Sequence, residues 1–204
     1  PPPPGAVPPG AVPPGAAGAR PRPAPTTFDD SWTERVRAAK HKAVFDSPEI
    51  ADGIALFQAW VYRDGYQKAL GAAPGDVVPI LVLRHAATVL TFDDPVWEKY
   101  DLGRLIKLHA TDDRGRKTKR FVATNPYSRP HTAEERRSPQ FMLEGLIASG
   151  VVVLACNNAF LGITSRMARA AGADVEAVRA EVRAGMLRGA TLQPSGIYAT
   201  ARAQ

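Results

Sequence analysis

The chain has 204 residues, a formal net charge of +6 and one cysteine. This length is enough for one domain with a full hydrophobic core, whereas two complete domains would be crowded. The single cysteine excludes an internal disulfide and any metal site built from several cysteines, and the sequence holds no apolar run of the length that crosses a membrane.

Residues 1–25 hold 11 of the 19 prolines, arranged in a five-residue repeat of the form PPGAV. This composition favours polyproline II interrupted by glycine and has no means of burying a core, so we expect an extended arm. At about 3.1 Å per residue, such an arm would span roughly 70 to 80 Å of a partner's surface.

The chain begins at Pro1 rather than at a methionine. Removal of an export signal would explain this start. We therefore expect an exported, extracytoplasmic protein at the periphery of a membrane, with a cytoplasmic location as the alternative.

Residues 26–40 connect the arm to the rest of the chain. Phe28, Trp32 and Val36 recur every four residues, which predicts a short amphipathic helix over 28–39. We expect its apolar side to cover an edge of the fold or a partner protein.

The segment 41–204 alternates apolar runs with stretches of helical periodicity. The runs predict four main strands, at 42–45, 77–83, 151–155 and 191–193. Strands that alternate with helices predict an α/β fold, with a mostly parallel sheet and helices on both of its faces.

The first connecting helix is expected to begin beside Pro48, where Asp46 or Ser47 would cap it. Ile54, Phe57 and Val61 then continue an apolar stripe at spacings of three and four residues. This spacing is typical of an amphipathic helix, and Trp60 is expected on the adjoining face.

An insert at about 104–139 interrupts the alternation with a predicted hairpin and a proline-rich loop. Residues 104–120 carry seven bases against two acids. We expect this hairpin to contact an anionic lipid surface or an acidic protein, or to be a solvated charged face. Nucleic acid is disfavoured, because few aromatic side chains accompany the bases. The candidate contact residues are Arg114, Arg116, Lys117, Lys119 and Arg120.

Cys156 stands where a buried strand meets a predicted helix. The thiol at a strand's carboxyl end would lie near the positive end of that helix, which favours a thiolate. The alternative is that Cys156 is a small buried hydrophobic residue.

Other polar residues also follow predicted strands, and parallel strands bring their carboxyl ends to one edge of a sheet. There Arg84 or His85 would stabilise a Cys156 thiolate, or would be ordinary strand-end residues bonded to backbone carbonyls. No metal site or cofactor is expected, because the four histidines lack ligand spacing and no glycine-rich phosphate loop follows the first strand. The remaining candidates at this edge are Asp46, Asn157, Asn158, Gln193 and Ser195.

The strand end at 155–159, the motif at 193–196 and the closing helix at 199–204 resemble the DsrE-like family of sulfur-relay proteins, over about residues 41–204. The resemblance implies a flavodoxin-like α/β sandwich that is often oligomeric. In family members with known chemistry a cysteine at this strand end carries a persulfide, and Cys156 is the matching position. The arm and the insert are additional to the family's pattern.

Two functions stay open. The first, which we favour, is a non-catalytic structural subunit whose arm docks onto a larger, membrane-associated protein assembly, with residues 1–25 and the 28–39 helix contacting the partner protein. The second is a sulfur carrier or sulfurtransferase that uses Cys156. Both leave room for a homo-oligomer.

Overall fold

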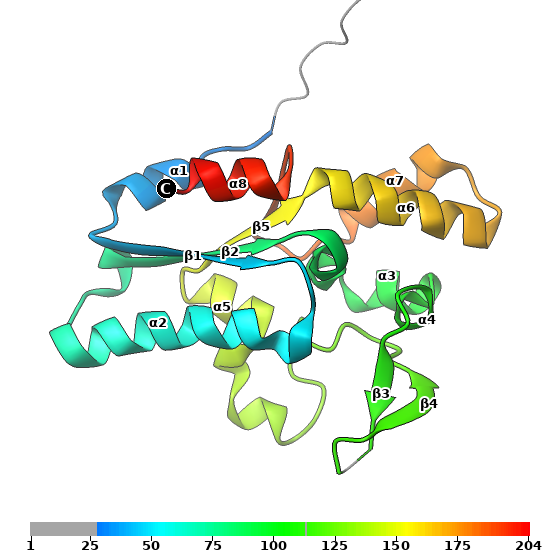
Figure 1. The fold of residues 1–204 in the computed structure, drawn as a ribbon, viewed down its shortest axis with the longest axis horizontal. Helices are drawn as coiled ribbons and strands as arrows, with labels where there is room; N and C mark the ends of the chain where they lie inside the picture. Colours follow the sequence, from blue (N-terminus) through cyan, green and yellow to red (C-terminus); the bar gives the residue numbers. More distant parts are fainter. Residues whose placement is uncertain (1–27, 113) are drawn as a thin grey trace, which may run out of the picture.

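The computed structural model describes residues 28–112 and 114–204, so the arm lies outside the described residues. Four parallel strands form the main sheet in the order β1-β2-β5-β6, as Figure 1 shows. The expected fold class is confirmed: this is an α/β fold, consistent with a flavodoxin-like architecture, whose sheet carries helices on both faces. The strands are β1 (His41–Ser47), β2 (Val77–Leu83), β5 (Val152–Cys156) and β6 (Ala190–Gln193).

Strand β2 is central and all seven of its residues are buried. Leu81 and Leu83 point to the face that carries α2 (Ile54–Leu70) and α5 (Leu143–Ala148). Val78, Ile80 and Val82 point to the opposite face, which is covered by α1 (Trp32–Ala38) and α8 (Gly196–Arg202). The continuous apolar run of β2 therefore reflects burial on both sides, as in other parallel sheets.

The order of the strands in the sheet follows the order of the chain without a reversal. The connecting helices α2, α5, α6 (Asn157–Ala171) and α7 (Val175–Ala184) all contribute to the same core cluster on one face. In open α/β sheets the ligand crevice forms where the strand order reverses. This sheet has no such reversal, so its topology provides no crevice of that kind.

Helix α1 confirms the helix expected over 28–39, with shorter bounds. Trp32 and Val36 are each only 5% exposed, and they pack with α8 against β2 and β5. The apolar side of α1 is thus used within the fold, where it covers a sheet face rather than an edge.

Helix α2 begins later than the sequence suggests. Ser47 Oγ donates a hydrogen bond to the carbonyl of Glu49, and Asp46 binds Arg84, so neither residue caps the helix. A 3-10 turn (Ala51–Gly53) comes first, and Gly53 takes a positive φ of 74° directly before Ile54.

The apolar stripe of α2 does not face the sheet. Ile54, Phe57 and Val61 are exposed, and the helix instead buries Ala55, Leu56 and Ala59. Small side chains allow the helix axis to approach the sheet closely, which turns the larger apolar residues outward.

Most of the remaining elements lie beyond the carboxyl ends of β2 and β5, on the right of Figure 1, whereas the turn Pro74–Asp76 directly precedes β2 at its amino end. The expected hairpin is present as β3 (His109–Thr111) and β4 (Lys117–Phe121), which pair antiparallel. These elements are the 3-10 turns Pro74–Asp76, His85–Thr91, Glu135–Arg137 and Pro139–Phe141, the helices α3 (Asp94–Lys99) and α4 (Leu102–Leu105), and the strands β3 (His109–Thr111) and β4 (Lys117–Phe121).

Asn125 fastens the proline-rich loop of the insert to the core. It is fully buried, and its Nδ2 donates hydrogen bonds of 2.7 Å to the carbonyls of both Leu90 and Phe92. Its Oδ1 accepts from the backbone N–H of Tyr127 at 3.0 Å. Each polar atom of this side chain therefore has a partner, as burial requires.

Asp94 at the start of α3 completes this anchor. Its Oδ1 accepts from the backbone N–H of Asn125 at 3.1 Å, and its Oδ2 lies 2.8 Å from Nη2 of Arg129. The loop at 125–139 is irregular, as expected, but its first residues are held by buried hydrogen bonds.

We expect Asn125→Ala to lower the free energy of unfolding by about 3 kcal/mol, because it leaves two buried carbonyls and one N–H without their partners. Urea denaturation would measure this change. The matched control is Asn158→Ala at an exposed position of α6, for which we expect a change within about 0.5 kcal/mol. Equal stability of the two variants would contradict the anchoring role.

Candidate functional site

The strand ends lie level at the carboxyl edge of the sheet. Ser47 is the register partner of Leu83, Leu83 of Ala155, and Cys156 of Gln193. The structure therefore brings the predicted strand-end residues to one edge. Their individual contacts decide what this edge can do.

Arg84 and Asp46 form a two-pronged ion pair at the ends of β1 and β2. Arg84 Nε lies 2.7 Å from Asp46 Oδ1, and Arg84 Nη2 lies 2.8 Å from Asp46 Oδ2. Helix α8 also packs closely against Arg84. A Cβ added at Gly196 would lie only 2.5 Å from the Cβ of Arg84, so a larger residue at this position would clash. Arg84 is thus held by the carboxylate of Asp46, in the bidentate geometry in which arginine binds carboxylates most strongly.

Cys156 ends β5 and is the residue directly before α6. The pKa of Arg84 is raised chiefly by its hydrogen bonds to Asp46, with smaller contributions from the charges of Asp46 and of Cys156. The thiol therefore stands at the N-terminus of α6 and close enough to Arg84 for their charges to interact. It is, however, only 7% exposed.

His85 is directed to other groups. It has a positive φ of 52°, and its Nδ1 lies 3.3 Å from Oε1 of Glu49. His85 also lines a cavity of about 360 Å³ together with Lys107 and Arg166, and Cys156 is not among the lining residues. Glu49 was not among the predicted site residues. Its position two residues after the end of β1 is a sequence signal that could have identified it.

Gln193 is fully buried and closes the β6 end of the edge. Its Nε2 donates to the backbone carbonyl of Asp29 at 2.8 Å and to that of Leu192 at 2.9 Å. The segment that leads into α1 is therefore fastened across the end of β6. Sequence reasoning missed Asp29, because a backbone carbonyl leaves no signal in residue type.

The other predicted residues of this edge serve local structure. Ser195 Oγ accepts a hydrogen bond from the backbone N–H of Tyr198 at 3.0 Å and so caps α8. Asn157 and Asn158 form the first turn of α6, where Asn157 is half-buried and Asn158 exposed.

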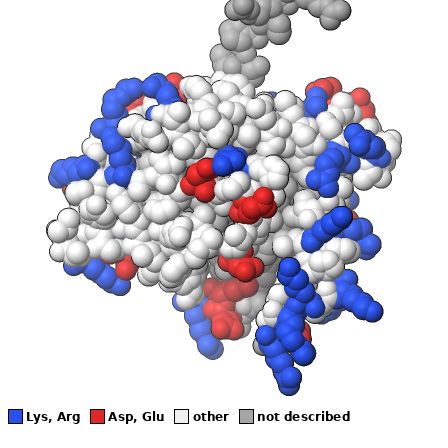
Figure 2. Space-filling model, viewed as in Figure 1, with Lys and Arg blue, Asp and Glu red and all other residues white. Residues whose placement is uncertain are grey.

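The basic side chains of the hairpin lie away from this edge, at the lower right of Figure 2. Arg116 Nε lies 2.9 Å from Asp112 Oδ2, a contact that lowers the pKa of Asp112. The guanidinium of Arg104 lies over the Phe121 ring, 5.2 Å from its centre. The five predicted contact residues are all exposed: Arg114, Arg116, Lys117, Lys119 and Arg120.

Within residues 28–112 and 114–204, no group of three or more His, Cys, Asp or Glu side chains is placed to hold a metal ion. No helix in the same part of the chain has the length and apolarity needed to cross a membrane.

Comparisons of the chain with protein-family models, with curated proteins and with solved structures found no match.

The burial of Cys156 gives a direct prediction. We expect the folded protein to react with iodoacetamide about 100-fold more slowly than the urea-unfolded chain, because the reagent must wait for local opening. Mass spectrometry of quenched samples would follow the reaction. The matched control is Ile197→Cys in a Cys156→Ser background, which replaces a side chain that is 65% exposed and should react at the unfolded rate. Similar rates for both thiols in the folded state would show that Cys156 is accessible.

Proposed function

We propose that this protein is a non-catalytic interaction subunit: a DsrE-like domain that docks through residues 1–25 onto a larger, membrane-associated protein assembly. One observation carries the proposal. At the carboxyl edge of the sheet, where an α/β enzyme binds its substrate, Arg84 is bound by Asp46 and Gln193 is bound to the backbone carbonyl of Asp29.

Three features of this edge argue against substrate turnover. Asp46 and Arg84 neutralise each other, Gln193 is fully buried against the chain, and the only thiol is 7% exposed. A catalytic group must reach the atoms on which it acts. Gln193 and Cys156 do not meet that condition without a rearrangement.

The contacts of the segment that precedes α1 support the docking part of the proposal. Gln193 binds the carbonyl of Asp29, and Arg202 lies 3.9 Å from Asp30. These contacts fix the point from which residues 1–25 extend. A partner bound by the arm would therefore be held at a defined side of the domain, which limits the entropy lost in the complex.

The position of Cys156 favours a second candidate function, that of a sulfur carrier. The thiol lies at the N-terminus of a 15-residue helix and within electrostatic reach of Arg84, and both features stabilise the anionic sulfur of a thiolate or a persulfide. This function would require the edge to open around Cys156.

Affinity purification of the tagged chain from its native cells tests the two functions against each other. We expect the full chain and Cys156→Ser to retain the same stoichiometric partner, and a chain whose residues 1–25 are replaced by a Gly/Ser segment of equal length to lose it. The replacement keeps the number of residues in the arm and removes its proline pattern.

Retention of the partner by the Gly/Ser chain would contradict docking through the arm. Loss of function in Cys156→Ser, together with a persulfide on Cys156 in the mass spectrum of the native protein, would establish the sulfur carrier instead.

A further inference from the structure

The cavity of about 360 Å³ that His85 lines lies beside the carboxyl end of β2. Its walls come from three segments that are far apart in the sequence: the 3-10 turn after β2, the end of α4, and α6. Residues from 85–89, 105–107 and 159–166 line it. A volume of this order is typical of small-molecule sites, and this cavity does not depend on a reversal of strand order.

Small residues keep the cavity open. Ala86, Ala159 and Gly162 stand on its walls. Gly162 lies within α6, where a glycine weakens a helix relative to alanine. A Cβ added at Gly162 would meet no atom of another segment of the described chain within 4 Å. The space beside this residue is therefore large enough for a ligand group to occupy.

The walls of the cavity are mainly apolar. Val89 and Ile163 are 1% and 8% exposed, and Leu105 and Ile106 are half-buried. Apolar walls with a few convergent polar groups are the usual composition of a ligand site. A compact apolar group that enters this cavity would therefore leave water, which favours its binding.

Two basic side chains at the cavity keep their charge without an acidic partner. Arg166 Nη2 donates a hydrogen bond to the backbone carbonyl of Leu105, which joins α6 to α4 but does not neutralise the guanidinium. Among the residues that the structure describes, neither Lys107 nor Arg166 forms an ion pair, and no Asp or Glu lines the cavity. The lining is therefore electropositive.

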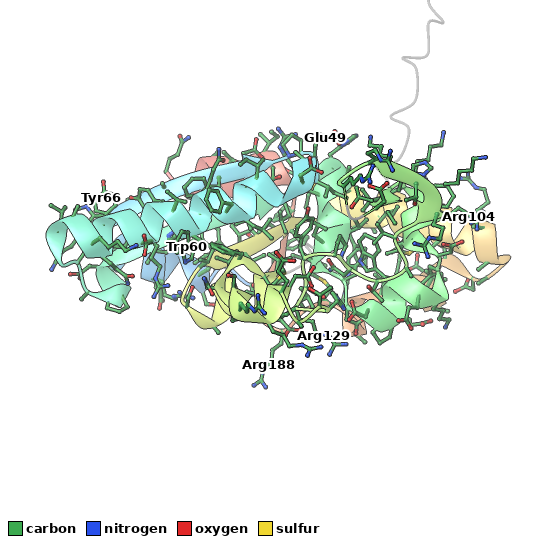
Figure 3. All side chains as sticks on the ribbon, turned by 90° about the horizontal axis from the view of Figure 1, so that it is seen from below. Glu49, Trp60, Tyr66, Arg104, Arg129 and Arg188 are labelled. Carbon is green, nitrogen blue, oxygen red and sulfur yellow. The ribbon has the colours of Figure 1, made fainter. Side chains whose placement is uncertain are left out.

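Two acidic side chains that border these segments already have partners. Glu49 Oε1 lies 3.3 Å from Nδ1 of His85, and Asp101 pairs with Arg104. Figure 3 shows Glu49 and Arg104 on the half of the molecule away from Tyr66. These pairs occupy His85 and Arg104 and leave the two basic side chains of the cavity free for an anionic ligand.

The backbone at two lining residues supports the same site. His85 and Lys107 have positive φ angles of 52° and 60°. Residues other than glycine rarely adopt this left-handed conformation, and those that do are concentrated at functional sites. Here the conformation occurs at two of the three basic residues of one cavity.

We propose that this cavity binds a small organic carboxylate. The acid group pairs with Lys107 and Arg166, and the apolar body packs on Val89, Leu105 and Ile163. Arginine suits a carboxylate because its planar guanidinium donates hydrogen bonds in a fixed fork. A phosphate is disfavoured, because the described lining has a single glycine, which lies within a helix, whereas phosphate-binding loops are rich in glycine.

An NMR titration of the isotope-labelled full chain with cinnamate tests this proposal. Cinnamate joins a carboxylate to a compact aromatic body, and for a ligand of this size we expect a Kd between about 0.1 and about 1 mM. The amide signals of residues 85–89, 105–107 and 159–166 should shift with one common Kd. Cinnamamide, which has the same shape without the charge, should bind at least about 10-fold more weakly.

Three outcomes of the titration would overturn the proposal. The first is the absence of shifts at about 5 mM cinnamate, which lies well above the expected Kd. The second is shifts confined to residues outside the cavity. The third is equal binding of cinnamate and cinnamamide, since the acid group would then have no cationic partner.

A variant that fills the cavity gives a sharper test. We expect Gly162→Phe to weaken the binding of cinnamate at least about 10-fold, because the new ring occupies the space of the ligand. The matched control is Gly65→Phe in α2, a position outside the cavity where an added Cβ is equally unobstructed. Circular dichroism melting checks that both variants are folded. Equal affinity of these two variants for cinnamate would contradict the proposed location.

Removal of a single charge tests the two basic residues. We expect Lys107→Gln and Arg166→Gln each to weaken cinnamate at least about 5-fold and to leave cinnamamide unchanged. The control is Arg169→Gln, an exposed base on the same helix that does not line the cavity. It lowers the net charge of the chain equally and should bind cinnamate like the wild type. An equal loss in all three variants would indicate general attraction of anions to a basic chain and would overturn the proposal.

This site and the proposed docking function fail separately. The titration tests the cavity without any partner protein, and replacement of residues 1–25 tests the arm while the cavity is intact.

Discussion

The burial of β2 on both faces is the constraint on which this structure depends. All seven of its residues are buried, so the sheet requires a layer of helices on each side. The connections between successive strands supply the layer that holds α2 and α5, and α1 and α8 supply the other. The same sequential winding leaves the sheet without a strand-order reversal, and at its carboxyl edge Asp46 and Arg84 bind each other.

The strands and the fold class were predictable because buried parallel strands leave a strong signal, a run of β-branched and leucine residues between turns. The orientation of α2 was not. The spacing of Ile54, Phe57 and Val61 shows that they share a face, but it does not say whether that face meets the chain's own sheet or another surface. The alanines at 55 and 59 held that information, because a helix packs most closely where its side chains are small.

The candidate site likewise has some features that the sequence predicted and others that it did not. The strand-end rule placed Asp46, Arg84 and Cys156 at one edge, because it depends only on the parallel direction of the strands. It did not predict that Arg84 is bound by Asp46, nor that Gln193 binds the backbone carbonyl of Asp29. Side-chain pairing and contacts to a distant main chain depend on distances that the order of residues does not encode.

The placement of α1 and α8 also has a consequence for synthesis on the ribosome. Val78, Ile80 and Val82 are translated long before Ala199 and Ala203, which cover them in the finished fold. Until the last turn of α8 leaves the exit tunnel, one whole side of the nascent sheet has only α1 as a cover. The time for which this face can attract a chaperone is therefore set by the translation of residues 196–203.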